Sequence, residues 1–242
     1  MLFYSYNPIL IAAAVVPAVI LLFYIYRADR LDKEPLRLLL SLILLGVIST
    51  GLALVTERLG LAWTAARYPE DGRTRALIEN FVVVALSEEG FKYLLLWVRT
   101  WRDPEFNCQF DAVVYAVFVS LGFALWENIS YVLEYGFSTA MIRAVTAVPG
   151  HACFGVFMGA WYGLAKRYYC YGKQAQSKFC RWLAVLLPAL LHGAYDYIAT
   201  SEGTASGLYF AAFVAVLFVI SFLLIRKLSR KDRFLGHSEW YS

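Results

Sequence analysis

Long apolar runs, each sufficient to cross a lipid bilayer as a helix, recur along the whole 242-residue chain. A membrane-spanning helix needs about 20 apolar residues, because each residue adds about 1.5 Å and the hydrocarbon core is roughly 30 Å thick. Hydrophobic residues make up 60% of the chain, against roughly 45–50% in soluble domains. The pattern predicts an all-α, polytopic transmembrane bundle with about seven spans, at residues 8–26, 36–56, 76–98, 111–133, 144–165, 182–199 and 207–225.

No linker or soluble-domain-sized insertion interrupts these runs, so we expect a single transmembrane domain over residues 1–242. Its motif-bearing core is expected at about 27–199, and its tail at 226–242. The first run lacks a preceding basic stretch and is interpreted as a retained span rather than a cleaved signal. The stretch from Glu57 to Arg75 mixes apolar and charged residues, and we interpret it as an amphipathic piece lying in the membrane interface.

The distribution of lysine and arginine predicts the orientation. With the N-terminus outside, 16 of the 22 basic residues fall in cytoplasmic segments and only 5 outside, with Lys92 inside a span. Basic residues in short loops collect on the cytoplasmic side, so we predict an external N-terminus and a cytoplasmic C-terminus. The net charge of +4 is spread between the spans. It therefore indicates a lipid bilayer as the surrounding partner and no nucleic acid. The four cysteines form no C-x-x-C pair, so neither disulfides nor a zinc ribbon are expected.

Several ionisable or strongly polar residues fall inside the predicted spans. An ionisable side chain at the centre of a span costs about 2.5–3.5 kcal/mol on insertion scales, so each one calls for a partner or a function. Four consecutive spans carry such residues: Glu88, Glu89 and Lys92; Glu127 and Asn128; His151; His192 and Asp196. Any one of these has a structural interpretation, as a buried ion pair or as a hydrogen bond between helices. Their occurrence on four successive spans favours a functional site.

Helical spacing predicts which of these side chains meet. Glu88 and Lys92 are i,i+4, and Glu89 and Lys92 are i,i+3. We therefore expect one carboxylate to pair with Lys92 and the other, about 100° round the helix, to face a cavity. His192 and Asp196 are also i,i+4, so the aspartate is expected to orient the imidazole.

A stripe of small residues on the fifth span predicts close helix packing. His151, Gly155, Gly159 and Gly163 follow one another at intervals of four, a spacing that lets membrane helices approach closely. His151 heads the stripe and should point into the bundle. Given the predicted orientation, the polar residues are expected in the extracytoplasmic half of the membrane.

Four motifs occur in a fixed order: Glu88-Glu89-x-x-Lys92, Phe123-x-x-x-Glu127-Asn128, His151, and His192-x-x-x-Asp196. The set resembles that of the PrsW intramembrane proteases, which belong with the CAAX-protease-like group of glutamic membrane proteases. The segment from Arg27 to Pro35 also resembles the first cytoplasmic loop of that family.

The resemblance implies an intramembrane endopeptidase in the bacterial cytoplasmic membrane. Its substrate would be a membrane protein with a single span, such as an anti-sigma factor. The catalytic positions it implies are Glu88, Glu89, Glu127, His151 and His192, with Asp196 in a supporting role.

Our hypothesis for the chemistry is that Glu88 or Glu89 deprotonates a water that attacks the peptide carbonyl. His151 and His192, with Asn128, would stabilise the oxyanion, while Lys92 holds one carboxylate ionised. We expect no cofactor. One alternative is a metal-dependent protease, with zinc held by the histidines and carboxylates. Another is a proton-coupled transporter, in which buried acids and histidines relay protons.

Overall fold

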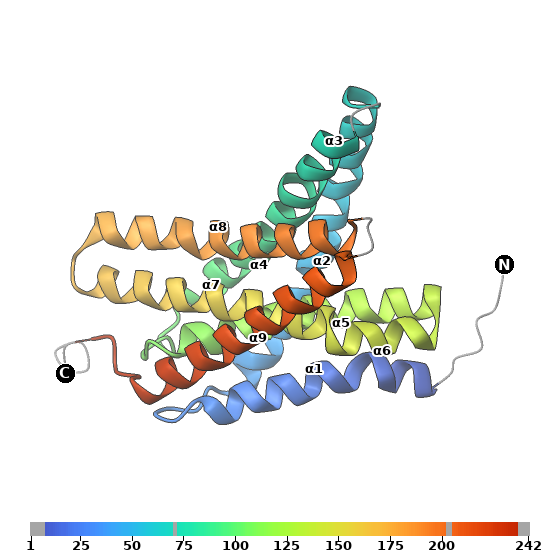
Figure 1. Ribbon diagram of the computed structural model, residues 1–242. Coiled ribbons are helices and arrows are strands. Elements are labelled where there is room, and N and C mark those ends of the chain that lie inside the picture. Colours follow the sequence, from blue (N-terminus) through green and yellow to red (C-terminus); the bar gives the residue numbers. More distant parts are fainter. Residues whose placement is uncertain (1–7, 70–71, 202–204, 237–242) are drawn as a thin grey trace.

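The computed structural model describes residues 8–69, 72–201 and 205–236, and nearly all of them are helical, with no strand among them. The helices, labelled as in Figure 1, are α1 (Pro8–Ala28), α2 (Leu36–Arg67), α3 (Gly72–Ile78), the π-helix η1 (Glu79–Ala85), α4 (Leu86–Thr100), α5 (Asp111–Tyr135), α6 (Phe137–Val145), α7 (Ala147–Cys170), α8 (Gln174–Ala199) and α9 (Ser206–Arg230).

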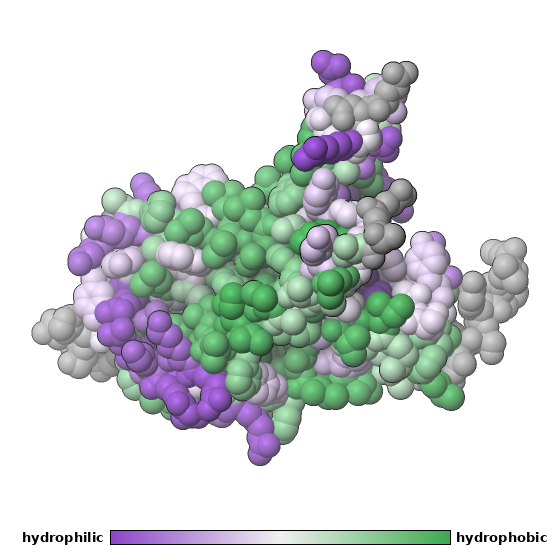
Figure 2. Space-filling view, viewed as in Figure 1, coloured by the Kyte–Doolittle hydropathy of each residue, from purple (hydrophilic) through white to green (hydrophobic). Residues whose placement is uncertain are grey.

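The described residues contain six helical stretches that are long and apolar enough to cross a membrane: α1, α2, α5, α6 with α7, α8 and α9. The span predicted at 76–98 is instead a succession of α3, η1 and α4, none of which reaches that length alone. Figure 2 shows a broad hydrophobic surface over the body of the molecule, with hydrophilic residues gathered at its left end and on the part that projects at the top. The chain is therefore a multi-pass membrane protein, and the predicted all-α transmembrane bundle is confirmed.

The stretch 57–75, predicted to be an amphipathic piece, is divided between two helices, and its location in the membrane interface stays a prediction. Helix α2 continues through this stretch to Arg67, and α3 begins at Gly72, with residues 70–71 outside the described part of the chain. The far half of α2 and α3 project from the bundle as an arm (Figure 1). Gly60 on α2 lies so close to Val83 of η1 that an added Cβ would be 2.5 Å from its side chain. The helix persists because its far half packs against the chain that returns along it.

Helix α5 lies at the centre of the bundle. In its most apolar 18-residue window, 78% of the residues are buried inside the protein, compared with 17% in α1. Every residue from Asp111 to Ala124 is buried, so α5 is surrounded by the other helices rather than by lipid.

The predicted glycine stripe forms the contact between α7 and α5. A Cβ placed on Gly159 would lie 2.4 Å from the Val113 Cα, and one on Gly163 would lie 2.4 Å from the Gln109 carbonyl oxygen. A second close crossing was not predicted: Gly46 of α2 and Gly122 of α5 sit where the two backbones touch. These two contacts fix α2 and α7 against the central helix, and thereby position the polar residues that they carry.

The predicted last span and tail differ slightly from the structure. Helix α9 continues to Arg230, five residues past the expected end of the span at 225. Of the predicted tail, residues 237–242 lie outside the described part of the chain.

Candidate active site

Three ionisable side chains enter the bundle from the first two turns of α4. Glu88, Glu89 and Lys92 are 5%, 0% and 0% exposed, respectively. The preceding segment, η1, is a π-helix, a form that is rare in proteins and occurs frequently at functional sites. The wider turn of η1 sets the rotation at which α4 begins, and so directs both glutamates inward.

The ammonium group of Lys92 is the hub of the cluster. It donates to Glu89 Oε1 at 2.7 Å and to Glu88 Oε2 at 3.1 Å, and it lies 3.8 Å from the centre of the Phe123 ring. The prediction that only one carboxylate would pair with Lys92 is wrong. An ammonium group has three donors, and the i,i+3 and i,i+4 positions both lie on its side of the helix.

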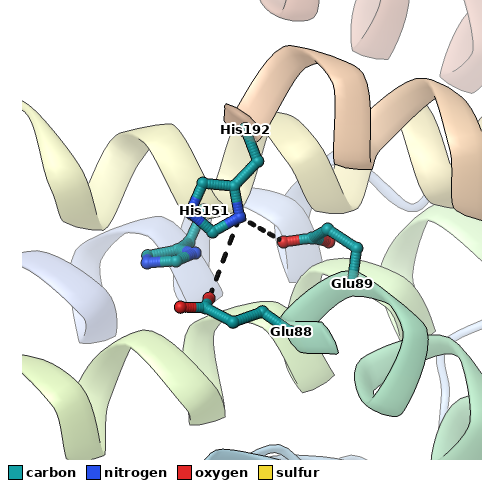
Figure 3. A group of neighbouring side chains, drawn as sticks. All are labelled: Glu88, Glu89, His151 and His192. Atoms are coloured by element: carbon teal, nitrogen blue, oxygen red, sulfur yellow. Dashed lines mark hydrogen bonds and ion pairs between the residues drawn. The ribbon is translucent and has the colours of Figure 1, made fainter. Parts of the chain in front are cut away.

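The His192 side chain of α8 points toward the same two glutamates, as Figure 3 shows. Its Nδ1 is 3.0 Å from Glu89 Oε1 and 3.8 Å from Glu88 Oε2, and its Nε2 is 3.3 Å from Asp196 Oδ2. The predicted i,i+4 pair with Asp196 is confirmed. Both ring nitrogens face carboxylates, which only accept hydrogen bonds when ionised, so the doubly protonated ring satisfies both contacts. The ring of Phe154 stacks on the imidazole with centroids 4.7 Å apart.

His151 of α7 lies between Lys92 and Glu127 and contacts both. Its Nδ1 is 3.2 Å from Lys92 Nζ and its Nε2 is 2.9 Å from Glu127 Oε2. Because the ammonium group only donates, Nδ1 accepts and the Nε2–H donates to Glu127, which is the neutral form of the ring. The two histidine rings are 5.1 Å apart and nearly perpendicular.

Glu127 and Asn128 of α5 complete the site, but in different ways. Glu127 Oε2 forms an ion pair with Arg143 Nη2 at 2.8 Å in addition to its contact with His151. Asn128 turns away from the glutamates: its Nδ2 donates to the Ala14 carbonyl of α1 at 2.9 Å and its Oδ1 accepts from Arg143 Nε at 3.1 Å. The structure therefore places Asn128 as a support for Arg143 and α1.

Sequence reasoning missed two residues of this site. Arg143 was counted only as a topology signal, although the short helix α6 brings it against Glu127. Glu57 was placed in the interfacial piece, whereas on α2 it lies within electrostatic range of Glu127 and Lys92. The sequence held a signal for each residue. Arg143 lies at the edge of an apolar run, and Glu57 directly follows one.

The donor set at the centre is of a kind that holds metals. Glu88, Glu89, His151 and His192 each offer one ligand atom, and these atoms lie within 4.8 Å of one another. Two imidazole nitrogens with two carboxylate oxygens suit zinc, and the buried Glu89 Oε2 has no hydrogen-bond partner among the described residues. The donors thus fit zinc chemically, but Lys92 contacts three of the four residues. A metal ion could bind the full set only if this ammonium group moved away.

Comparison with known proteins agrees with the ordered motifs. The family model described as PrsW family intramembrane metalloprotease matches residues 34–225. Protease PrsW of Oceanobacillus iheyensis is 34% identical over 218 residues, covering 90% of this chain and 95% of that protein. Protease PrsW of Geobacillus kaustophilus is 36% identical over 206 residues, covering 84% and 86%, and that of Bacillus subtilis is 32% identical over 194 residues, covering 79% and 83%.

No solved structure matches the chain. The family model nevertheless covers most of the sequence, including every residue of the cluster. The curated relatives are proteases and match this chain over most of their length. The chain therefore belongs to the PrsW family of intramembrane proteases.

Proposed function

We propose that this protein is an intramembrane endopeptidase that uses a glutamate to activate water for attack on a peptide bond. The observation that carries the proposal is the convergence of Glu88 and Glu89 with two cationic partners, Lys92 and His192, inside the bundle. A base next to preorganised cationic donors is what hydrolysis needs, because negative charge develops on the carbonyl oxygen in the transition state.

We assign the role of general base to Glu88. Its side chain is 7% exposed, whereas that of Glu89 is 0% exposed. Glu89 Oε1 is held at once by Lys92 and His192, at 2.7 and 3.0 Å, while the contacts of Glu88 with the same groups are 3.1 and 3.8 Å. Glu88 is therefore the more accessible and less restrained of the two, and Glu89 positions the cations.

The proposed reaction has two steps. Glu88 takes a proton from water as the water oxygen bonds to the scissile carbonyl carbon, and the Lys92 ammonium and the His192 N–H stabilise the resulting oxyanion. The tetrahedral intermediate then collapses with breakage of the C–N bond, and the proton on Glu88 passes to the leaving amine. His151 is neutral and donates its only N–H to Glu127, while its Nδ1 accepts from Lys92. We therefore assign it, with Glu127 and Arg143, to positioning Lys92.

The proposed substrate is a membrane protein with a single span, such as an anti-sigma factor, and the proposed location is the bacterial cytoplasmic membrane. His151 lies four residues after the start of α7, and His192 lies seven residues before the end of α8. Both positions are near the end of the bundle that the basic residues predict to be outside. We therefore propose cleavage in the extracytoplasmic half of the membrane.

The test is cleavage of co-expressed single-span candidates by wild type, Glu88→Gln, Glu89→Gln and, as a control, Glu134→Gln, which changes an exposed carboxylate on α5. Loss of a general base lowers hydrolysis by about 10²–10⁴-fold, so E88Q should be nearly inactive while remaining folded. E134Q should cleave like wild type. Cleavage by folded E88Q at the wild-type rate would refute the mechanism.

A metal-dependent protease is the second candidate, favoured by the four clustered donors and by the matching family's description. Zinc bound by Glu88, Glu89, His151 and His192 would supply Lewis-acid activation of water and of the carbonyl. The position of Lys92 favours the metal-free site, since its charge occupies the place of the ion. We expect purified protein to contain no stoichiometric zinc and to cleave equally in chelator; one zinc per chain, lost in His192→Ala, would establish the metal enzyme.

The proton-coupled transporter considered from the sequence is not favoured by any comparable observation. The relatives that match the chain are proteases. The carboxylates of the cluster form ion pairs with basic side chains of the protein itself.

A further inference from the structure

A second group of buried carboxylates lies at the other end of the bundle, where α1 ends and where α2 and α5 begin (Figure 1). Asp29 follows α1, Glu34 precedes α2, and Asp111 is the first residue of α5. Asp111 is about 24 Å along α5 from Glu127, because 16 residues separate them at about 1.5 Å each. This group is thus separate from the proposed active site.

The three side chains are close together and almost completely removed from solvent. Asp29, Glu34 and Asp111 are 2%, 4% and 0% exposed, and one carboxylate oxygen from each lies within 4.8 Å of the other two. Three carboxylates at this separation repel one another unless protons or a cation compensate their charge.

Protein partners use only part of the group's hydrogen-bonding capacity. Glu34 Oε2 accepts from the Tyr115 hydroxyl at 2.7 Å, and Asp111 Oδ2 accepts the backbone N–H groups of Asn107 and Cys108 at 3.0 and 2.6 Å. Both oxygens of Asp29, and Asp111 Oδ1, are buried and have no hydrogen-bond partner among the described residues. The hydrogen bonds orient Glu34 and Asp111 and leave three oxygens unused.

Within the described part of the chain, no lysine or arginine forms an ion pair with any of the three carboxylates. Lys33 attracts the Asp29 carboxylate electrostatically, but its ammonium group donates to the backbone carbonyl oxygens of Tyr26 and Asp29 rather than to a carboxylate. Burial raises the pKa of Asp29 to about 6, and it also raises the pKa of Glu34. The fold tolerates these charges poorly without a compensating cation.

We propose that Asp29, Glu34 and Asp111 bind a hard divalent cation, Mg²⁺ or Ca²⁺, which joins the α1–α2 loop to the start of α5. All three ligands are oxygens, which these ions prefer. Ca²⁺, at about 2.3–2.6 Å from each oxygen, spans separations of this size, and Mg²⁺, at about 2.0–2.1 Å, would draw the oxygens closer together. The unpartnered oxygens of Asp29 and Asp111 become ligands, and the repulsion between the carboxylates is offset.

A softer metal is less suited to this end of the bundle. Cys108, Asp111 and Asp232 also place ligand atoms within 4.8 Å of one another. Asp29 and Glu34, however, add only oxygen ligands to Asp111, and oxygen is the donor that hard cations prefer. The all-oxygen group therefore predicts selectivity for hard cations over zinc.

The test measures thermal unfolding of purified full-length protein in detergent, first stripped with chelator and then titrated with MgCl₂ or CaCl₂. NaCl of matched ionic strength controls for screening. The variants are Asp29→Asn and Glu34→Gln, which keep side-chain size, and Asp32→Asn, which alters an exposed carboxylate of the same loop. At a cation concentration about 100 times Kd, wild type should gain about 5–10 °C in Tm.

We expect D32N to respond like wild type and both D29N and E34Q to lose the response. In chelator, D29N should be at least as stable as wild type, because it removes an uncompensated buried charge. Glu89→Gln should keep the response, which separates this site from the metal-binding alternative at the active site. Calorimetric titration of wild type with either ion should give about one ion per chain, and this measurement does not depend on any variant folding. Absence of binding to wild type, or an equal response in D29N or E34Q, would overturn the proposal.

Discussion

Lys92 contacts both glutamates, His151 and the face of Phe123, although its side chain is completely buried. A buried ammonium group is tolerated only where carboxylates compensate it, and the carboxylates in turn depend on the ammonium group. Lys92 and the two glutamates are therefore a single electrostatic unit. Removal of Lys92 while both glutamates remain should therefore destabilise the bundle interior.

Lys92→Met should be strongly destabilising, by roughly 3–5 kcal/mol, because it leaves two buried carboxylates without their shared cation. The double variant Lys92→Met with Glu89→Gln should recover part of that loss, since one uncompensated charge is removed as well. Thermal unfolding in detergent measures both effects. Lys178→Met, which changes an exposed lysine of α8, is the matched control. Equal stability of K92M and K178M would show that Lys92 is not the counter-ion of the cluster.

At the level of helices, the interior of the protein is organised by glycines on α7 that face α5. Gly159 is the tightest of them, with the Val113 Cα, the Ala112 carbonyl oxygen and the Val113 nitrogen all within 3.0 Å of an added Cβ. All three atoms belong to the backbone of α5, so they cannot move aside independently. The separation of the two helices is therefore set by the absence of a side chain at this position.

Gly159→Ala should push α7 away from α5 and lower both the yield of folded protein and its Tm. Gly51→Ala is the control, because Gly51 lies within α2 and an added Cβ there meets nothing within 4 Å. That substitution should be neutral or stabilise the helix by up to about 1 kcal/mol. Size-exclusion chromatography and thermal unfolding compare the two variants. Wild-type behaviour of G159A would mean that the helices have room that the structure does not show.

The sequence predicted those features that depend on spacing within one helix. The i,i+3 and i,i+4 pairs of α4, the His192–Asp196 pair and the glycine stripe are all local in sequence. Contacts between helices were not predictable in the same way. Arg143 reaches Glu127 because α6 folds back after Gly136, whose φ of 85° permits a sharp turn. The π-helix η1 was also missed, since apolar residues in this stretch fit an α-helix equally well.

At the scale of the whole molecule, the buried carboxylates described above form one group near each end of the bundle. The orientation of the bundle decides which side of the membrane each group faces. The basic residues predict that the end with the three clustered carboxylates faces the cytoplasm. The end of α7 at Cys170 lies on the same side in that arrangement. Cys170 is exposed, while Cys108, Cys153 and Cys180 are buried, so a single cysteine reports the orientation.

A membrane-impermeant maleimide should therefore fail to label the wild-type protein in intact spheroplasts and should label Cys170 in inverted vesicles. Cys170→Ser should abolish that labelling. In the same C170S background, Glu134→Cys introduces a thiol at the opposite end of the bundle, and it should react from outside. Labelling of Cys170 in intact spheroplasts would reverse the predicted topology.

Charge pairing within one helical turn also governs how the nascent chain enters the bilayer. Because Lys92 lies one turn after Glu88 and Glu89, this helix reaches the insertion machinery with one excess negative charge instead of two. Glu127 receives Arg143 from the next helix to be synthesised, and His192 has Asp196 on its own helix. These acidic and basic partners of the proposed active site thus find an opposite charge on their own helix or a consecutive one. We expect that the helices are inserted in order of synthesis, without waiting for the complete bundle to shield their polar residues.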